Sequence, residues 1–369
     1  VAAGDDVAFA TAAGFCPAVE RAGFRAFPAG LSLPDQLRLA AERFPEQHAL
    51  PHGRERFEAF VPRMLAGVAA PARAADLLGL LEAWRPDVLV HDETDFGGPV
   101  AATVAGIPYA DHSVGPLRPL DMARLARATL EPLWSEHGVD LGEFGGLFHH
   151  LYLDVCPPSL QSPEIALVPV AQRMQNTAID TGDERLPEWI ERLRAVPVVY
   201  VSLGTIFNQR RDVFGAILDG LHGEDVEVIV TVGAENDPAA LGSQPDNVHV
   251  ERFIPQSALL PRCDVAVNQG GTAILPILAH GLPMLLVPQG ANQFHNAQAC
   301  TAAGVARALN PGEVTADAVR RDVHALLQEP AYRERAAAVA RELAAMPGPD
   351  EGVRRVRRLA QDGVVLAPS

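Results

Sequence analysis

Short apolar runs recur along the chain and alternate with segments of helical apolar spacing. In the second half these runs are Val198 to Leu203, 226–232, 248–250, 265–267 and 284–287. Helical segments separate the runs, and two more, 315–327 and 331–345, follow them. Nearly continuous apolar strands that alternate with helices are typical of a parallel sheet covered on both faces. The second half therefore predicts a doubly wound α/β domain.

The first half shows the same alternation with longer helical segments. Strands are predicted at 7–11, 24–28, 88–90 and 107–109, and helices at 15–22, 35–83 with a break at 51–53, 99–105 and 120–137. The leucines of 73–84 have the spacing of a helix packed on a sheet. Residues 138–185 are predicted to be loop-rich because prolines recur there, and an interdomain linker is expected near 175–195.

Length and composition agree with two domains. The chain has 369 residues, of which 48% are hydrophobic and 21% charged, and such a length exceeds what one core usually supports. We predict a domain at 1–180, a second at 196–345, and a C-terminal helix and tail at 346–369 that pack back toward the first domain. We find no apolar run that approaches the roughly 18 residues of a membrane span.

Charge and cysteine usage exclude several classes of protein. A net charge of −16 argues against nucleic-acid partners and anionic membranes. All basic residues are arginine, which excludes a Walker A lysine and a Schiff-base lysine. The four cysteines are far apart and form no C-x-x-C pair, so we expect a reduced, cytoplasmic protein.

The stretch 263–297 predicts the binding chemistry. A strand ends at Gly270-Gly271, a short helix follows, and a second strand leads to Asn292-Gln293. The carboxyl ends of parallel strands open on one edge of a sheet, so both loops should lie side by side. Bare backbone N–H groups at a helix start suit a diphosphate, and side-chain amides suit hydroxyls. Together these groups suit a nucleotide sugar.

Three further motifs allow more than one interpretation each. The turn at Ser202 to Thr205 suits a phosphate, or is an ordinary βα turn that needs glycine. Phe253, followed by Gln256, suits a nucleotide base, but a core phenylalanine is the favoured interpretation. The acidic loop 91–95 is by default an exposed turn; it also suits an acid that orients a catalytic histidine, with metal binding the minority interpretation. The pair His149-His150 is expected to be solvated.

The ordered set of motifs resembles the bacterial branch of the family 1 glycosyltransferases, which decorate antibiotics and other natural products. The matching pieces are 7–11, 84–90, 106–108, 199–205, 253–256, 268–271 and 281–297. The resemblance implies the GT-B fold, α/β with two Rossmann-like, doubly wound parallel-sheet domains facing a central cleft. It also implies inverting transfer of a sugar from UDP or dTDP to a hydroxyl of a lipophilic acceptor, without metal or other cofactor.

The resemblance also implies roles for particular residues. Phe253 and Gln256 would face the base, and Asn292 and Gln293 would bind the sugar hydroxyls. The diphosphate would lie on residues of two turns, namely Thr205, Asn268, Gly270, Gly271 and Thr272. Asp92, or with less support Asp95, would orient the catalytic histidine.

The chain departs from the family pattern in three places. The family's first strand and its catalytic-histidine loop would precede Val1, so we expect an exposed apolar edge in the first sheet. Asn268 stands where the family has a histidine, and the turn is one residue short before Ala273. Asn292 replaces an aspartate, and a charged hydrogen bond contributes about 1.5–3 kcal/mol against ~1 kcal/mol for a neutral one.

Two other functions remain open at the level of sequence. A non-catalytic nucleotide-sugar or natural-product binding protein fits the expected lack of a base, and a nucleotide-sugar epimerase is the third alternative. The moderately apolar segments 35–80 and 110–150 are expected to line the acceptor pocket. A homodimer is expected as the commonest assembly.

Overall fold

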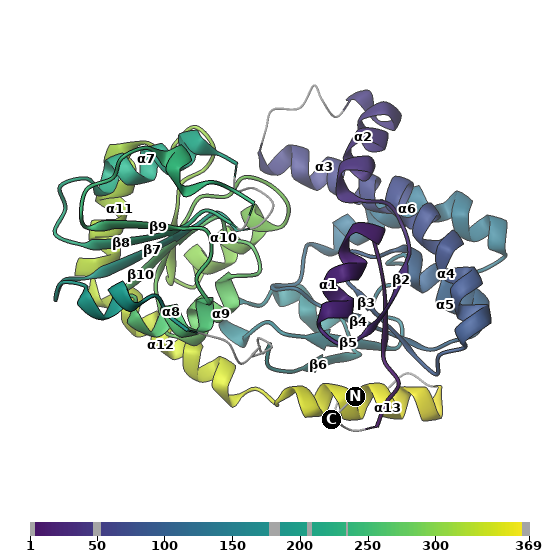
Figure 1. Ribbon diagram of the computed structural model, residues 1–369. Coiled ribbons are helices and arrows are strands. Elements are labelled where there is room, and N and C mark those ends of the chain that lie inside the picture. The colour runs from purple at the N-terminus through teal and green to yellow at the C-terminus, as the bar shows by residue number, and fades with distance from the viewer. Residues whose placement is uncertain (1–3, 47–52, 177–184, 205–208, 234, 364–369) are drawn as a thin grey trace. The chain divides into compact units, whose positions relative to one another are not determined.

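Figure 1 shows the computed structural model, which describes residues 4–46, 53–176, 185–204, 209–233 and 235–363. The chain divides into two units. Unit 1 comprises Val1–Asp154, Pro163–Met174 and Asp350–Ser369, and unit 2 comprises Val155–Ser162 and Gln175–Pro349. The chain thus returns to unit 1 twice, at Pro163 and at Asp350.

Unit 2 is built on one parallel sheet, as the apolar runs predicted. Its strands follow the order β12-β11-β10-β7-β8-β9, and every pairing is parallel. The strands are β7 (Val198–Ser202), β8 (Glu227–Thr231), β9 (Val248–Glu251), β10 (Val265–Asn268), β11 (Met284–Leu286) and β12 (Ala306–Ala308). Only β12 was not predicted, because its Ala-Arg-Ala sequence contains no apolar run.

Helices cover both faces of this sheet (Figure 1). They are α7 (Arg211–Leu221), α8 (Gln256–Leu259), α9 (Ile274–Ala279), α10 (Gln293–Ala302), α11 (Ala316–Gln328) and α12 (Pro330–Ala345). On one face, Ile217 of α7 and Val319 of α11 join the alternate strand residues Val201, Val230 and Val267 in one continuous core. The two-residue period of the strands explains why these valines share a face.

Unit 1 contains two separate parallel sheets. The first has β1 (Ala8–Thr11) and β2 (Arg25–Pro28), and the second has the order β3-β4-β5-β6. Its strands are β3 (Leu89–Asp92), β4 (Tyr109–His112), β5 (Leu151–Asp154) and β6 (Ala171–Arg173). The prediction that 138–185 is loop-rich was wrong for β5 and β6. Prolines flank both strands, and β6 has the weakly apolar sequence Ala-Gln-Arg.

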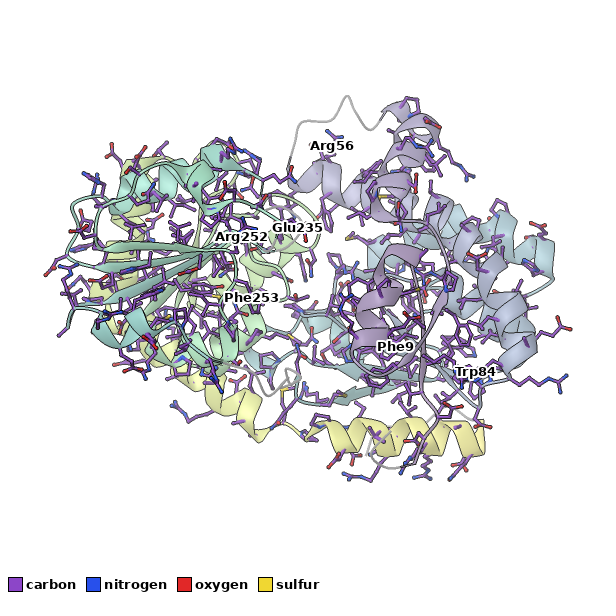
Figure 2. All side chains as sticks on the ribbon, in the orientation of Figure 1. Phe9, Arg56, Trp84, Glu235, Arg252 and Phe253 are labelled. Atoms are coloured by element: carbon purple, nitrogen blue, oxygen red, sulfur yellow. The ribbon has the colours of Figure 1, made fainter. Side chains whose placement is uncertain are left out.

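Each sheet of unit 1 has an edge strand that exposes apolar side chains. Within the described part of the chain, β1 pairs only with β2, and β3 only with β4. Phe9 on β1 is 44% exposed and Val90 on β3 is 48% exposed. Phe9 is partly covered by an edge-on contact with Phe24, at 5.1 Å between ring centroids. The expected exposed apolar edge is therefore present (Figure 2).

The helices of unit 1 surround these sheets. They are α1 (Cys16–Arg21), α2 (Leu33–Arg43), α3 (Arg54–Met64), a π-helical turn (Leu65–Ala69), α4 (Ala70–Trp84), α5 (Gly97–Ala105), α6 (Leu120–His137) and α13 (Pro349–Asp362). The bounds of α6 are those predicted. Helix α13 packs Leu359 against Ala110 of β4 and Leu153 of β5. Arg357 of α13 also pairs with Asp5 at 2.8 Å.

One helical stretch changes an expectation about membranes. Arg54–Trp84 is 31 residues long and contains an 18-residue window with a mean hydropathy of 1.4, enough to cross a membrane by length and composition. The statement that no run approaches this length was wrong, because α3 and α4 continue through the π-helical turn. Ala66, Ala70 and Ala74 of this stretch are buried in one cluster with Leu130 of α6, so its apolar residues serve the core of unit 1.

Candidate functional site

Three loops of unit 2 meet at the carboxyl ends of β7, β10 and β11. Asn268, which ends β10, lies in register with Ser202 of β7 and Leu286 of β11. Gly204 has φ +70°, and a Cβ there would lie 2.2 Å from Gln269 Nε2. Gly270 has φ +83°, and a Cβ there would lie 3.2 Å from the Gln293 carbonyl oxygen. Glycine at both positions lets the loops touch, as predicted for this βαβ unit.

Two buried asparagines hold the glycine turn from opposite sides. Asn268 Oδ1 accepts a hydrogen bond from the Gly270 N–H at 2.7 Å, and Asn296 Nδ2 donates one to the Gly270 carbonyl at 2.8 Å. Both side chains are 1% exposed. Asn268 Nδ2 and Asn296 Oδ1 are buried without a partner among the described residues, so the turn retains one donor and one acceptor. The sequence had not singled out Asn296.

Gln293 has a structural role in the neighbouring loop. Its side chain is buried, and Oε1 accepts hydrogen bonds from the N–H groups of Gln289 at 2.7 Å and Gly290 at 3.0 Å. That oxygen is therefore used within the loop, although a role of Gln293 with sugar hydroxyls stays a prediction. Asn292 is half-buried at the start of α10, and its side chain does not cap the helix.

The remaining predicted residues of the turn differ in accessibility. Gly271 is buried and Thr272 is exposed. The helix after the turn, α9, has only six residues, so the anion site expected there depends on the turn's N–H groups. Thr205 lies outside the described residues.

Phe253 is an exposed aromatic residue rather than a core residue. Its exposed fraction is 69%, and it follows β9 in the loop that leads into α8 (Figure 2). The interpretation that favoured a core phenylalanine was wrong. Gln256, at the start of α8, is hydrogen-bonded to the Tyr200 hydroxyl. An exposed ring close to this amide is compatible with a nucleotide base, and the assignment stays a prediction.

Arg210 is a charged residue near these loops that sequence reasoning missed. Its Nη1 donates to Gln289 Oε1 at 2.7 Å, while Nε and Nη2 bind the Asp212 carboxylate at 2.9 Å and 2.6 Å. The hydrogen bonds from Arg210 lower the pKa of Asp212 to about 2, so this carboxylate is ionised at neutral pH. The pair fixes the guanidinium beside the loop that follows β11.

In unit 1 the acidic loop after β3 places its carboxylates in different environments. Asp92 is exposed, and its Oδ1 accepts from the Thr94 N–H at 2.8 Å and from the Thr94 hydroxyl. Asp95 Oδ1 accepts from the N–H groups of Gly97 at 3.0 Å and Gly98 at 3.2 Å at the start of α5. Asp95 therefore serves as a helix cap, and Asp92 remains the candidate acid.

A buried histidine lies immediately before this loop. His91 Nε2 is 2.9 Å from Asp111 Oδ1, and both side chains are at most 2% exposed. Asp111 Oδ2 also accepts from the Phe148 N–H at 2.7 Å. Burial by itself lowers the pKa of His91, but the Asp111 carboxylate outweighs it and the pKa is raised to about 9. His91 is therefore an imidazolium that neutralises Asp111 inside unit 1.

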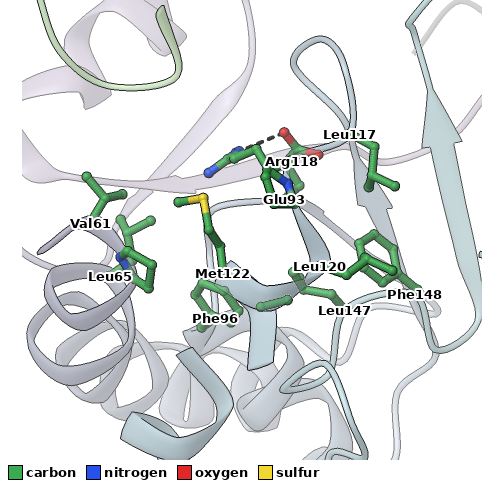
Figure 3. A pocket seen from close by; sticks show the side chains of 13 residues that line it. Val61, Leu65, Glu93, Phe96, Leu117, Arg118, Leu120, Met122, Leu147 and Phe148 are labelled. Carbon is green, nitrogen blue, oxygen red and sulfur yellow. Dashed lines mark hydrogen bonds and ion pairs between the residues drawn. The ribbon is translucent and has the colours of Figure 1, made fainter. Parts of the chain in front are cut away.

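A mainly apolar recess opens above α6 in unit 1. Its cavity volume is about 40 Å³, and it continues into open solvent. The lining residues are Val61, Pro62, Leu65, Glu93, Phe96, Leu117, Arg118, Pro119, Leu120, Met122, Ala123, Leu147 and Phe148. Figure 3 shows an ion pair on one side of the recess, with Phe96, Leu147 and Phe148 on the other. The expected acceptor segments 35–80 and 110–150 supply most of this lining.

The ion pair consists of Arg118 and Glu93. Arg118 Nη2 lies 2.8 Å from Glu93 Oε1, and the Tyr152 hydroxyl donates to Glu93 Oε2 at 2.9 Å. Burial raises the pKa of Glu93, against the opposing effect of Arg118. The default of an exposed acidic turn was wrong for Glu93, which is 6% exposed. Its partner is 25 positions away in sequence, so no local pattern revealed the pair.

The histidine pair of the sequence is only partly solvated. His149 is exposed, whereas His150 is half-buried with its ring 4.7 Å from that of Tyr109. Burial, together with the neighbouring His149, lowers the pKa of His150 to about 4, so this ring is neutral at pH 7. Within the described ranges, no group of three or more histidine, cysteine or acidic residues is placed to hold a metal ion.

Comparison with protein families gives matches over most of the chain. The model described as Erythromycin biosynthesis protein CIII-like (EryCIII-like), N-terminal domain, matches residues 1–204, and the corresponding C-terminal model matches 215–359. The 4'-demethylrebeccamycin synthase of Lentzea aerocolonigenes is 30% identical over 94% of this chain and 90% of its own length. The aclacinomycin-T 2-deoxy-L-fucose transferase of Streptomyces galilaeus is 29% identical over 78% of this chain and 69% of its own length.

Solved structures agree with the sequence matches. The glycosyltransferase SnogD of Streptomyces nogalater superposes with a TM-score of 0.73 at 25% identity, covering 97% of this chain and 92% of that one. The glycosyltransferase SsfS6 of Streptomyces sp. SF2575, complexed with thymidine diphosphate, gives 0.75 at 25% identity with the same coverage. The predicted fold class is confirmed. The shares of this chain and of the solved structures that superpose give no support to the expectation that a first strand and histidine loop are missing.

Proposed function

The chain belongs to the EryCIII-like family and is a glycosyltransferase, and from that premise we propose that it moves a sugar from dTDP to a hydroxyl of a lipophilic polyketide or similar natural product. Two relatives whose names describe sugar transfer to such compounds, and a neighbour bound to thymidine diphosphate, support this choice of donor and acceptor. The binding-protein and epimerase alternatives have no comparable support.

The observation that carries the donor half of the proposal is the convergence of loops in unit 2. Gly204 and Gly270 bring two backbone turns into contact, and the asparagine clamp fixes the second turn. We assign the diphosphate to this turn, where N–H groups offset charge on the leaving group. Phe253 and Gln256 are assigned to the thymine base, and Asn292 to a sugar hydroxyl.

The acceptor half rests on the recess of unit 1. A mainly apolar lining with one ion pair supports the proposal of a lipophilic acceptor that carries few polar groups.

We propose the inverting mechanism for the chemical step. The catalytic histidine that the family resemblance implies, oriented by Asp92, takes the proton of the acceptor hydroxyl as the hydroxyl oxygen bonds to the anomeric carbon. The bond between that carbon and the diphosphate oxygen breaks, and dTDP leaves with the electron pair. Attack opposite to the leaving group inverts the anomeric centre. Asp92 Oδ1 is held by Thr94, which leaves Oδ2 for the base.

Two measurements test these assignments in order. Calorimetric titration of the full chain with dTDP and with UDP, without acceptor, should show binding of dTDP and weaker binding of UDP. Absence of dTDP binding to folded protein would contradict the donor site. The anomeric configuration of a transfer product, read by NMR coupling constants, should be opposite to that of the donor, and retention would exclude the inverting step.

Two further expectations are proposals about context. Cys16, Cys156, Cys263 and Cys300 are all free thiols, which is compatible with a cytoplasmic enzyme. A homodimer is proposed only as the commonest assembly, and light scattering of the purified chain would test it.

A further inference from the structure

The recess of unit 1 contains one cation, Arg118, with N–H donors that its counter-ion Glu93 does not use. Both oxygens of the Glu93 carboxylate have partners, Arg118 on Oε1 and Tyr152 on Oε2. Arg118, in contrast, uses Nη2 for Glu93, and the described part of the chain supplies no other hydrogen-bond partner for it. A guanidinium carries five N–H groups, so several donors of Arg118 remain free.

The Arg118 guanidinium belongs to the lining of the recess. The Arg118 side chain is 14% exposed and is part of the recess lining, where Figure 3 shows its guanidinium near Met122. The other lining side chains, apart from Glu93, are apolar. An apolar molecule that fills the recess would strip water from the free N–H groups, and a buried donor without a partner costs about 1–3 kcal/mol. A ligand therefore binds best when it brings an acceptor oxygen to this position.

We propose that Arg118 is a specificity-determining residue, which selects acceptors that carry a carbonyl oxygen on an otherwise apolar ring system. The inference rests on the proposed function, since it assigns the recess to the sugar acceptor. Glu93 holds the guanidinium in place through one oxygen, and Tyr152 holds Glu93 through the other. The ion pair is thus a fixed donor at one side of the recess, and the apolar side chains opposite it bind the body of the ligand.

The alternative is that the ion pair only stabilises unit 1. Glu93 needs a cation once it is buried, and Arg118 supplies it. This structural role of Arg118 requires one or two of its five N–H groups, and it does not require the ligand to carry an acceptor oxygen. The two roles are separated by comparing ligands that differ only in carbonyl oxygens, because a purely structural pair would treat both alike.

The test uses two flat probes, hydroxymethyl-anthraquinone and hydroxymethyl-anthracene, which share ring size and hydroxyl but differ in the ring carbonyls. Binding to the full chain is measured by fluorescence titration, without nucleotide. The wild type should bind the quinone about tenfold more tightly than the anthracene. Arg118→Met keeps an unbranched apolar stem and removes the N–H donors, so it should abolish this preference and leave anthracene binding within about twofold.

A second variant guards against loss of folding. Arg118→Met combined with Glu93→Gln removes both charges and leaves an amide oxygen for Tyr152, so it avoids a buried unpaired carboxylate. This double variant should also bind both probes equally. Met122→Leu is the matched control in the lining, and it should change the affinity for the two probes by the same factor.

The outcomes separate this inference from the proposed function. Equal wild-type affinities for the two probes, no binding of either, or a quinone preference that survives in the folded double variant would overturn the role of Arg118. Titration of the same samples with dTDP tests the donor site of unit 2 independently. Wild-type binding of dTDP with no probe preference would leave the transferase proposal in place and remove only the selection by Arg118.

Discussion

The two units use parallel strands in opposite ways. Unit 2 has one six-stranded sheet, and on one face of it a large cluster of buried side chains joins most of the strands with α7 and α11. Unit 1 has a two-stranded and a four-stranded sheet, and its buried side chains fall into several smaller clusters. Continuous packing fixes loop ends, whereas divided packing leaves space between clusters. Under the proposed function, the loops of unit 2 that bind the donor would need the first property, and the recess of unit 1 that binds the acceptor would need the second.

The difference predicts different cooperativity in the two units. In unit 2 a defect on α7 should affect β7, β8 and β10 together, because their side chains share the core on that face of the sheet. In unit 1 a defect should remain within its cluster. Hydrogen exchange of backbone amides reports opening of each segment separately and can therefore test the comparison directly.

The largest effect is expected for Ile217→Ala in α7. Ile217 is fully buried in the core of unit 2, so the change should lower the free energy of unfolding by about 3–4 kcal/mol. Exchange should accelerate together in β7, β8 and β10. Faster amide exchange confined to α7 would contradict a core that α7 shares with these strands.

The matched change in unit 1 is Leu77→Ala in α4. Leu77 is 4% exposed and packs with Ala10 of β1 and Leu89 of β3. The loss of stability should be similar, but exchange should accelerate around α4, β1 and β3 and remain slow in β5. Equal acceleration of all strands of unit 1 would show that its clusters unfold as one.

The second-largest effect is a pH dependence of the free energy of unfolding, which His91 of unit 1 causes. The pKa of His91 is raised from 6.5 to about 9 in the fold, so its stabilising contribution is complete below pH 6.5 and is lost as the pH rises to 9. A shift of this size corresponds to roughly 3 kcal/mol. Asp111, Asp95 and the Asp92 carbonyl are the groups that act on the ring.

Urea unfolding between pH 6.5 and pH 9 measures this contribution. The free energy of unfolding should fall over that interval in the wild type and stay nearly level in His91→Gln, which lacks a titrating ring. His150 is the control, since its pKa is lowered to about 4 and it affects stability only below pH 6.5. An unchanged slope in His91→Gln would assign the pH dependence to another group.

Sequence patterns predicted the fold well where strands are apolar along their length. The strands of unit 2 from β7 to β11 and helix α6 were found because their burial depends on local spacing. Strands β6 and β12 were missed because they contain Ala-Gln-Arg and Ala-Arg-Ala, and neighbouring strands rather than their own side chains determine their conformation. The apolar strand β5 (Leu-Tyr-Leu-Asp) was also missed, because the prolines that follow it suggested a loop. The local sequence propensity of a segment does not reveal which strand will pair with it in the sheet.

The candidate site was predicted in part for the same reason. The loops after β10 and β11 could be placed side by side because the topology of a βαβ unit requires it. Phe253 was expected in the core because an isolated aromatic residue gives no sign of its environment. The Arg118–Glu93 pair and the Asn296 contact to Gly270 join residues 25 and 26 positions apart, and only the folded chain brings them together.

The third effect concerns the asparagine clamp of unit 2. Asn296→Ala removes the donor to the Gly270 carbonyl and leaves that buried oxygen unpaired, which costs about 1–3 kcal/mol. We expect dTDP to bind roughly tenfold more weakly in calorimetry, since the turn loses its fixed geometry. Asn292→Ala is the control, because Asn292 makes no capping bond and dTDP lacks the transferred sugar that Asn292 is proposed to bind. Equal losses in both variants would argue against the clamp.

The smallest effect is expected for Phe253→Ala. A side chain that is 69% exposed contributes little to folding, so the melting temperature should stay within about one degree of the wild type. If the ring stacks on thymine, its loss should raise the Kd for dTDP about fivefold, the equivalent of roughly 1 kcal/mol. Leu167→Ala, at a residue of unit 1 that is 60% exposed, should change neither quantity. Unchanged dTDP binding in Phe253→Ala would remove this ring from the donor site and leave the glycine turn as the part of unit 2 that binds the nucleotide.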